Sequence, residues 1–209
     1  VRRTPLHPVT QALNAEFVAR QGWQVTERFT NPEGECAAAR GRVVLADEST
    51  NGKIGVEGER AEGALETAFD LPLLNIGCGG SANTNRIYRL RKDLFFVSTP
   101  PGQELATSKD MRSAAEEAGE FVTVTDLTHA RSEIRIIGPH GRELLSKVCG
   151  LDFYPDAFDN GTAKLSSLAK TTQLIIRRDI GKLPAFSIIG AASLGRYLWK
   201  TLEQAGKEF

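Results

Sequence analysis

The sequence has no excess of charge of either sign. Lysine and arginine together number 26, aspartate and glutamate also number 26, and the formal net charge at pH 7 is zero. Nucleic acids and anionic membrane surfaces attract proteins through a basic excess, which this chain lacks. The composition therefore argues against both as partners. A length of 209 residues is enough for one large domain or two small ones.

Cysteines are also few. Cys36, Cys78 and Cys149 are an odd number, lie far apart and include no C-x-x-C pair. The sequence therefore predicts free, buried thiols rather than a disulfide framework or a zinc site. The three histidines are equally isolated, which is typical of surface or turn positions, so no metal site is predicted.

Long apolar runs are absent. No uninterrupted apolar segment approaches the ~20 residues of a membrane-spanning helix. Residues 1–17 lack the apolar core of a secretion signal. We expect no membrane association and a cytoplasmic location.

One segment occurs twice. Residues 43–65 and 121–145 share an Asp, a Gly and a Leu in the same order, with identical spacing from Gly to Leu. The matched pairs are Asp47 with Asp126, Gly58 with Gly138, and Leu65 with Leu145. Such internal similarity indicates a duplicated unit.

The later copy shows the pattern of two strands and a helix. Val122 and Val124 alternate with Thr, and Ile134 and Ile136 alternate with charged residues. This period of two predicts antiparallel neighbouring strands, each with one buried and one solvated face. Gly138 can adopt the positive φ of a strand exit before the helix.

Asp47 and Asp126 end the first strand of their copies. A carboxylate at such a place is either catalytic or bonded to the amides of a turn. The second arrangement is the commoner one, and we adopt it for both residues.

The rest of the chain is divided by turn and helix signals. A short helix is expected from Thr10 to just before Gly22, and an Ala-rich helical turn at 36–40. Residues 70–85 are expected to form a loop, 86–98 a hairpin around 91–93, and 108–118 a helix capped by Ser108. In the second half a loop spans 150–162, strands lie around 173–178 and 185–189, and a helix follows Ser193.

This order predicts an α+β fold of duplicated strand-strand-helix units with antiparallel sheets. We expect residues 1–209 to form a single domain of two pseudo-repeats, about 41–119 and 120–206.

The last helix, over residues 194–205, carries one apolar stripe. Leu194, Tyr197, Leu198 and Leu202 recur at three- and four-residue steps, so they should pack on a sheet. Trp199 lies beside this stripe. Its indole is either a flanking core residue or an anchor for a partner subunit.

Several motifs together resemble a known family. At the start these are T-P-L at 4–6, A-L-N-A at 12–15, G-W at 22–23, C-A-A-A-R at 36–40 and G-K-I at 52–54. They resemble the glycine-cleavage T-protein, a tetrahydrofolate-dependent aminomethyltransferase. Later motifs are R-L-R-K-D at 89–93, F-F-V at 95–97, T-D-L-T at 125–128, G-P at 138–139, L-D at 151–152 and Y-L-W at 197–199. These are more similar to the γ subunit of heterotetrameric sarcosine oxidase.

The resemblance implies a T-protein-like folate-binding domain without the C-terminal barrel of T-proteins. The family has a Gly-containing loop with paired aspartates, one of them beside the reacting folate nitrogen. Here that loop has no Asp or Glu between Asp70 and Asp93, and Asn83 stands in the catalytic position. An amide cannot carry the proton that a carboxylate can. The family's second carboxylate, which holds the folate ring, falls where Lys182 stands.

Two functions from different classes follow. The first is a γ-subunit-like assembly subunit of a one-carbon flavoenzyme complex that oxidises sarcosine or another N-methyl amine. Larger flavoprotein subunits would then be its partners, with no catalytic residue in this chain. The alternative is a stand-alone tetrahydrofolate-dependent aminomethyl or methyl transferase whose pocket uses Asn83, Tyr88 and Arg178. The residues themselves assign no cofactor, and tetrahydrofolate is the one that the resemblance implies.

Overall fold

The computed structural model describes all residues except Leu73, Ala118 and Glu120. Helices are interspersed with antiparallel sheets, which confirms the predicted α+β class. The chain divides into two compact units: unit 1 comprises residues 1–50 and 131–209, and unit 2 comprises residues 51–130. None of the helices in the described part of the chain has the length and apolar character needed to cross a membrane.

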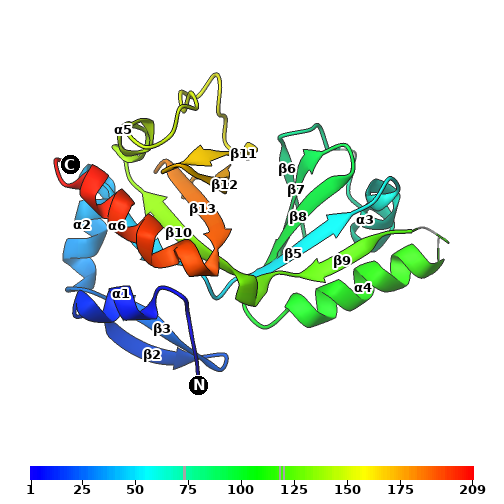
Figure 1. The fold of residues 1–209 in the computed structure, drawn as a ribbon, viewed down its shortest axis with the longest axis horizontal. Helices are drawn as coiled ribbons and strands as arrows, with labels where there is room; N and C mark the ends of the chain where they lie inside the picture. Colours follow the sequence, from blue (N-terminus) through cyan, green and yellow to red (C-terminus); the bar gives the residue numbers. More distant parts are fainter. Residues whose placement is uncertain (73, 118, 120) are drawn as a thin grey trace. The chain divides into compact units, whose positions relative to one another are not determined.

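Unit 1 is built on a five-stranded antiparallel sheet (Figure 1). In spatial order its strands are β11 (Ala163–Leu168), β12 (Thr171–Arg177), β13 (Ala185–Ala191), β10 (Arg131–Ile137) and β4 (Val44–Asp47). Ile134 and Ile136 of β10 pack with Leu144 of α5 (Gly141–Ser146) and Leu198 of α6 (Gly195–Gly206). These helices therefore cover one face of the sheet and close the larger apolar core.

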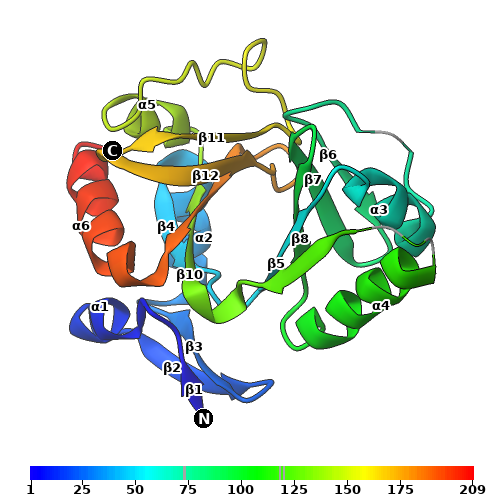
Figure 2. The same ribbon diagram turned by 45° about the vertical axis from the view of Figure 1, so that its right-hand side comes forward.

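Unit 2 contains a second five-stranded antiparallel sheet (Figure 2). Its strands, in spatial order, are β6 (Gly79–Ala82), β7 (Asn85–Arg91), β8 (Leu94–Thr99), β5 (Gly52–Glu57) and β9 (Thr123–Asp126). Two helices, α3 (Ala61–Phe69) and α4 (Glu104–Glu117), pack against each other and onto this sheet. Their core joins Ile54, Leu65 and Met111.

The first strands of the two copies are exchanged between the sheets. β4 pairs with β10, with Asp47 opposite Ile134, whereas β9 pairs with β5, with Asp126 opposite Ile54. The prediction that the two strands of the later copy are neighbours is therefore wrong. The period-2 pattern predicts that a segment is a strand but not which strand it joins.

The N-terminal segment differs from the predicted helix. The helix α1 (His7–Ala12) is shorter, has Pro8 in its first turn, and is followed by β2 (Glu16–Arg20) and β3 (Trp23–Arg28). Phe17 lies on β2, which pairs antiparallel with β3, and β1 (Arg2–Arg3) pairs parallel with β3. Proline is well suited to the first turn of a helix, so it begins α1 instead of excluding it.

The next helix, α2 (Pro32–Gly41), confirms the Ala-rich helical turn and extends it toward the N-terminus. Asn31 caps it: the Oδ1 atom accepts a 2.7 Å hydrogen bond from the Gly34 N–H. Every residue of α2 is exposed or half-buried. The helix is thus held mainly at its ends and along one side.

Several other boundaries change. The hairpin over 86–98 is confirmed as β7 and β8, but β6 lies within the predicted loop and β11 was not predicted. α4 begins at Glu104, so Ser108 lies buried inside the helix instead of capping it. The predicted end of that helix at Ala118 lies outside the described residues. In unit 1, Ser193 belongs to a 3-10 turn (Ala192–Leu194), and Leu194 takes the N-cap position of α6.

The paired aspartates and glycines have structural roles. Asp47 Oδ1 accepts a 3.0 Å bond from the Ser49 N–H, and Asp126 Oδ1 accepts a 2.9 Å bond from the Thr128 N–H. Gly138 has φ +131°, and a Cβ there would clash with the Arg42 carbonyl oxygen. These contacts confirm the turn interpretation of the aspartates and the positive φ of this glycine.

Burial corrects two expectations about reactive side chains. The cysteines are free, as predicted, but Cys36 and Cys78 are exposed and Cys149 alone of the three is buried. His7 is 4% exposed and its ring centroid lies 4.3 Å from that of Phe17, with the rings tilted by 48°, so it is a buried residue instead of a surface one. Burial lowers the pKa of His7 from its ordinary value of 6.5.

Trp199 is 2% exposed and belongs to the core of unit 1, where its ring lies 6.2 Å from that of Phe29. The core interpretation of this residue is therefore confirmed. Leu198 and Leu202 are fully buried, while Tyr197, on the edge of the predicted stripe, is 46% exposed.

Candidate functional site

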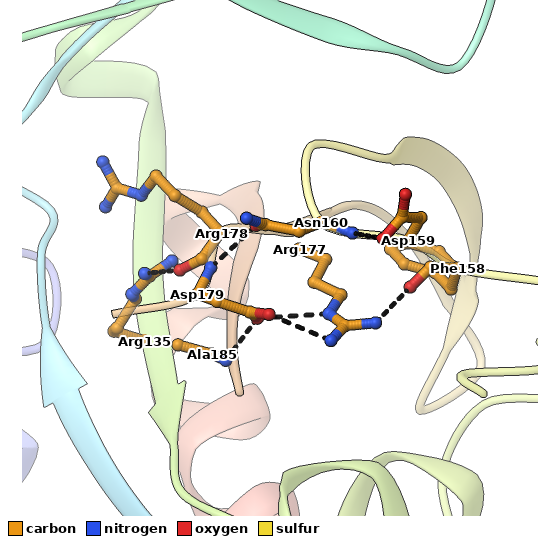
Figure 3. Close-up of polar contacts among 8 residues, drawn as sticks. All are labelled: Arg135, Phe158, Asp159, Asn160, Arg177, Arg178, Asp179 and Ala185. Atoms are coloured by element: carbon orange, nitrogen blue, oxygen red, sulfur yellow. Dashed lines mark hydrogen bonds and ion pairs between the residues drawn. The ribbon is translucent and has the colours of Figure 1, made fainter. Parts of the chain in front are cut away.

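Arg178, one of the predicted folate-pocket residues, follows β12 in unit 1 and is anchored by both backbone and side chain. Its N–H donates a 2.8 Å bond to the Ala185 carbonyl, and its own carbonyl accepts a bond from Arg135 Nη2. Its Nη2 atom donates a 2.8 Å bond to Glu48 Oε2. Figure 3 shows its side chain extending away from the Asp179 carboxylate. The guanidinium is therefore held in one place while remaining 25% exposed.

Asp179, the next residue, is the centre of the contacts drawn in Figure 3. Its Oδ1 accepts 3.1 Å bonds from Arg177 Nε and from the Ala185 N–H, and its Oδ2 accepts a 2.9 Å bond from Arg177 Nη2. Arg177 also donates a 2.8 Å bond to the Phe158 carbonyl. Both oxygens of this carboxylate therefore accept hydrogen bonds within unit 1. Arg177 and Asp179 together link β12, β13 and the loop at 158–160, and we call this arrangement the clamp.

Asn160 completes this clamp. Its Oδ1 accepts a 3.0 Å bond from the Asp179 N–H. The side chains of Arg177 and Asp179 are only 10% and 15% exposed, so the pair is largely shielded from water. A bidentate, shielded pair of this kind fixes geometry more strongly than a surface ion pair does.

Arg135 is a buried charged residue that sequence reasoning missed. It lies on the central strand β10 with its side chain 2% exposed. Its Nη1 donates a 3.0 Å bond to Ser187 Oγ on the neighbouring β13, and its Nε lies 3.8 Å from Glu48 Oε1. Glu133, two residues earlier, is also buried. The prediction of a solvated face for this strand is therefore wrong.

β10 lies between β4 and β13, and the side chain of Arg135 is enclosed by contacts with Ser187 of β13, with Glu48 next to β4, and with the Arg178 carbonyl. A buried charge is tolerated only when it is paired, and Ser187, Glu48 and the Arg178 carbonyl supply partners to Arg135. In the sequence, β10 shows only an alternation of apolar and charged residues. This pattern does not distinguish a charged face exposed to water from a charged face that is buried.

The other two predicted pocket residues, Asn83 and Tyr88, lie in unit 2. Asn83 has φ +53° in the two-residue turn between β6 and β7 and is exposed. Tyr88 lies on β7 opposite Gly79, in the fourth residue pair of the ladder counted from that turn, and is 4% exposed. The hairpin therefore separates these two side chains instead of bringing them together. Arg178 belongs to the other unit.

The second family position, at Lys182, lies in the turn between β12 and β13. Lys182 is exposed, and the turn is closed by hydrogen bonds in both directions between Ile180 and Leu183. Among the described residues, His, Cys, Asp and Glu form no group of three or more that could hold a metal ion. The side chains at the predicted positions are a guanidinium, an amide, a phenol and an ammonium group, all of which can donate hydrogen bonds.

Comparison with known proteins identifies similar sequences. The family described as GCVT N-terminal domain matches residues 6–209. An aminomethyltransferase of Saccharopolyspora erythraea is 24% identical over 99% of this chain, and one of Geobacillus thermodenitrificans is 26% identical over 100% of it. The chain spans 59% of the length of each of these relatives.

Two solved structures share the fold. A chain of heterotetrameric sarcosine oxidase from Corynebacterium sp. U-96 has a TM-score of 0.75 and 23% identity, covering all of this chain and 96% of that one. The glycine cleavage system aminomethyltransferase T from Bartonella henselae has a TM-score of 0.82 and 22% identity, covering 96% of this chain and 56% of that one.

Proposed function

Because the chain belongs to the GCVT N-terminal domain family, we propose that it is an assembly subunit of a sarcosine-oxidase-like flavoenzyme complex. In this proposal the complex is cytoplasmic, oxidises sarcosine or another N-methyl amine, and passes the one-carbon unit to tetrahydrofolate. Larger flavoprotein subunits hold the flavins and the folate site. This chain binds the larger subunits as a structural component of the complex and does not catalyse the reaction.

The observation that carries this proposal is the lack of an available carboxylate at either family position. Residues 71–92 include no Asp or Glu, and Asn83 stands exposed at a hairpin tip. At the second position Lys182 replaces the acid, and both oxygens of nearby Asp179 accept bonds from Arg177 and Ala185. General acid-base catalysis needs a group that can take a proton from the reacting atom, and a pterin amidine is best held by a carboxylate.

The structural likeness to the sarcosine oxidase chain supports the same proposal, because the alignment extends over nearly the full length of both chains. The sarcosine oxidase it resembles is heterotetrameric. A chain that reproduces one subunit of such an assembly is suited to the same kind of environment.

Two measurements test the proposal. The untagged protein is isolated from its native source at low ionic strength, and co-purifying chains are identified by mass spectrometry. We expect larger flavin-containing subunits in fixed stoichiometry. The separated chain is then titrated with tetrahydrofolate by calorimetry, and we expect no saturable heat. Isolation of the chain alone, together with tight folate binding, would overturn the proposal.

The alternative function is a stand-alone tetrahydrofolate-dependent aminomethyl or methyl transferase. The similarity to aminomethyltransferases over the whole chain favours it. Its pocket would rely on Asn83, Tyr88 and Arg178. Under this alternative, Tyr88→Phe and Arg178→Lys each weaken tetrahydrofolate binding, while Arg196→Lys on α6 does not. Under the assembly proposal, there is no binding to weaken.

A further inference from the structure

A pocket of about 600 Å³ lies within unit 1, lined by residues of β3, α2, β4 and α6. We call it the α2 pocket. It is separate from the Arg178 and Asp179 cluster and is lined by none of the residues named above for folate. Pockets of ~300–1,000 Å³ accommodate small organic ligands when apolar walls are combined with a few placed polar groups.

The walls of the α2 pocket are mainly apolar. Phe29, Leu45 and Ile137 line it together with Ala38 and Trp199. α2 has no buried residue anywhere along its fully described length, so the helix stands over this space without filling it. An apolar space of this size is costly to leave to water, and a ligand with an apolar body would remove that cost.

The polar groups that line the α2 pocket are predominantly acidic. The charged groups among them are four carboxylates and one guanidinium, namely Glu27, Glu35, Asp47, Glu203 and Arg28. Arg28 is paired at 2.6 Å with Glu16, a carboxylate that does not line the pocket, and Glu27 and Glu35 attract it at longer range. Glu27 is likewise paired with Arg20 at 2.7 Å.

Glu35 and Glu203 differ from those two. In the part of the chain that the structure describes, neither carboxylate forms an ion pair with a basic side chain. Glu35 accepts 2.6 Å and 2.8 Å bonds from the Phe29 and Thr30 N–H groups, which fixes it at the pocket wall. Glu203 is exposed on α6, one turn from Trp199. The pocket therefore presents negative charge beside aromatic rings.

We propose that the α2 pocket binds a hydrophobic organic cation, an ammonium nitrogen carrying an alkyl or aryl group. The apolar part lies against Leu45, Ala38 and Ile137. The charged nitrogen lies between the half-buried ring of Phe29 and the carboxylates of Glu35 and Glu203. Aromatic rings attract cations through their negative faces, and the carboxylates add attraction that a neutral or anionic ligand would not receive. This inference does not rest on the proposed function.

Cys36 provides a direct reporter, because its exposed thiol lines the pocket, whereas the equally exposed Cys78 lies in unit 2. The full chain is treated with iodoacetamide at increasing concentrations of hexyltrimethylammonium, and the two alkylation rates are measured by peptide mass spectrometry. We expect Cys36 to be protected at least ten-fold at saturation, with the rate at Cys78 unchanged. Heptanol and heptanoate, the neutral and anionic counterparts, should protect Cys36 much less at equal concentration.

Three variants make the test specific. Glu203→Gln should raise the concentration for half-protection about two- to five-fold, the range expected for losing one partly exposed charge contact. Glu208→Gln, which changes a carboxylate that pairs with Lys147 and does not line the pocket, should leave it unchanged. Ala38→Phe, which fills the space, should abolish protection.

Four results would overturn the proposal. The first is absence of Cys36 protection by hexyltrimethylammonium, and the second is equal protection by heptanoate. The third is equal protection of Cys36 and Cys78, and the fourth is an unchanged concentration for half-protection in Glu203→Gln. If Ala38→Phe does not fold, the comparison of ligand charges and the glutamate variants still decide, because Glu203 is exposed and its substitution leaves the core intact.

Discussion

Arg177 and Asp179 hold each other through two hydrogen bonds, 3.1 Å from Nε to Oδ1 and 2.9 Å from Nη2 to Oδ2. The same carboxylate accepts a bond from the Ala185 N–H. We predict that Asp179→Asn lowers the free energy of unfolding by about 2–3 kcal/mol, because it leaves a shielded guanidinium without its charged partner. Urea denaturation measures this. Asp156→Asn, at an exposed position nearby, is the control and should change stability by less than about 0.5 kcal/mol. An equal effect of the two changes would contradict the clamp.

Trp199 is a second stability determinant, because it is 2% exposed in the core of unit 1. We predict that Trp199→Ala lowers the free energy of unfolding by roughly 3 kcal/mol or more, as large-to-small core substitutions do. Lys200→Ala, at the exposed neighbouring position, serves as the control. An unchanged melting temperature together with weaker assembly would instead assign Trp199 to a subunit interface.

His7 should make stability depend on pH. Burial, and to a smaller extent Arg3, lowers the pKa of His7 below 6.5, and Asp47 partly opposes this. As the pH falls, the unfolded chain therefore takes up the proton on His7 before the folded chain does. The contribution of His7 to stability is complete above pH 6.5 and is lost as the pH falls below 6.5. We predict that His7→Leu shows a smaller loss of stability between pH 7.5 and 5 than the wild type. Urea denaturation at several pH values measures this, and an equal loss of stability in the two proteins would contradict it.

Asn83→Asp should not create transferase activity. Asn83 is exposed at a hairpin tip with φ +53°, a conformation that Asp also tolerates, so the variant should fold normally. Restoring a carboxylate there leaves Lys182 at the second family position. Aminomethyl transfer to tetrahydrofolate is measured for both proteins. A clear gain in the variant would show that the folate pocket is functional and would favour the transferase alternative.

The prediction of a single domain of two pseudo-repeats can be tested by following unfolding in each unit. Both tryptophans, Trp23 and Trp199, report on unit 1, and a fluorophore on Cys78 in a Cys36→Ser background reports on unit 2. We expect coincident urea transitions, as one cooperative domain requires. Two separate midpoints would show that the units unfold independently.

Local patterns predicted many elements but not their partners. The turn at residues 91–93 predicted the hairpin of β7 and β8, because a short turn between alternating apolar runs leaves one way to pair. The strands β9 and β10 are also separated by a short segment. Thr128–Ala130 forms a 3-10 turn there, and the two strands continue into different sheets. Long-range pairing is decided by tertiary packing, which a short window of sequence does not contain.

The candidate site was predictable in part for the same reason. The resemblance placed attention on Arg178 and on the segment at 179–183, where the structure has a dense polar network. It gave no sign of Arg135, because an alternating charged residue on a strand looks like a solvated one. Phe17 shows a similar ambiguity: its spacing from Leu13 fits a helix, but the positive φ of Asn14 ends the helical region first.

The exchange of β4 and β9 between the sheets has a consequence for how the protein is made. As the chain leaves the ribosome, β4 emerges long before the synthesis of β10, the strand with which it pairs in the described part of the chain. All of unit 2 is translated in between. During that interval β4 is an unpaired strand, the kind of segment that joins other chains when it stays exposed. Slow translation through residues 51–130, or a truncation before β10, should therefore favour aggregation through β4 over a stable partial fold.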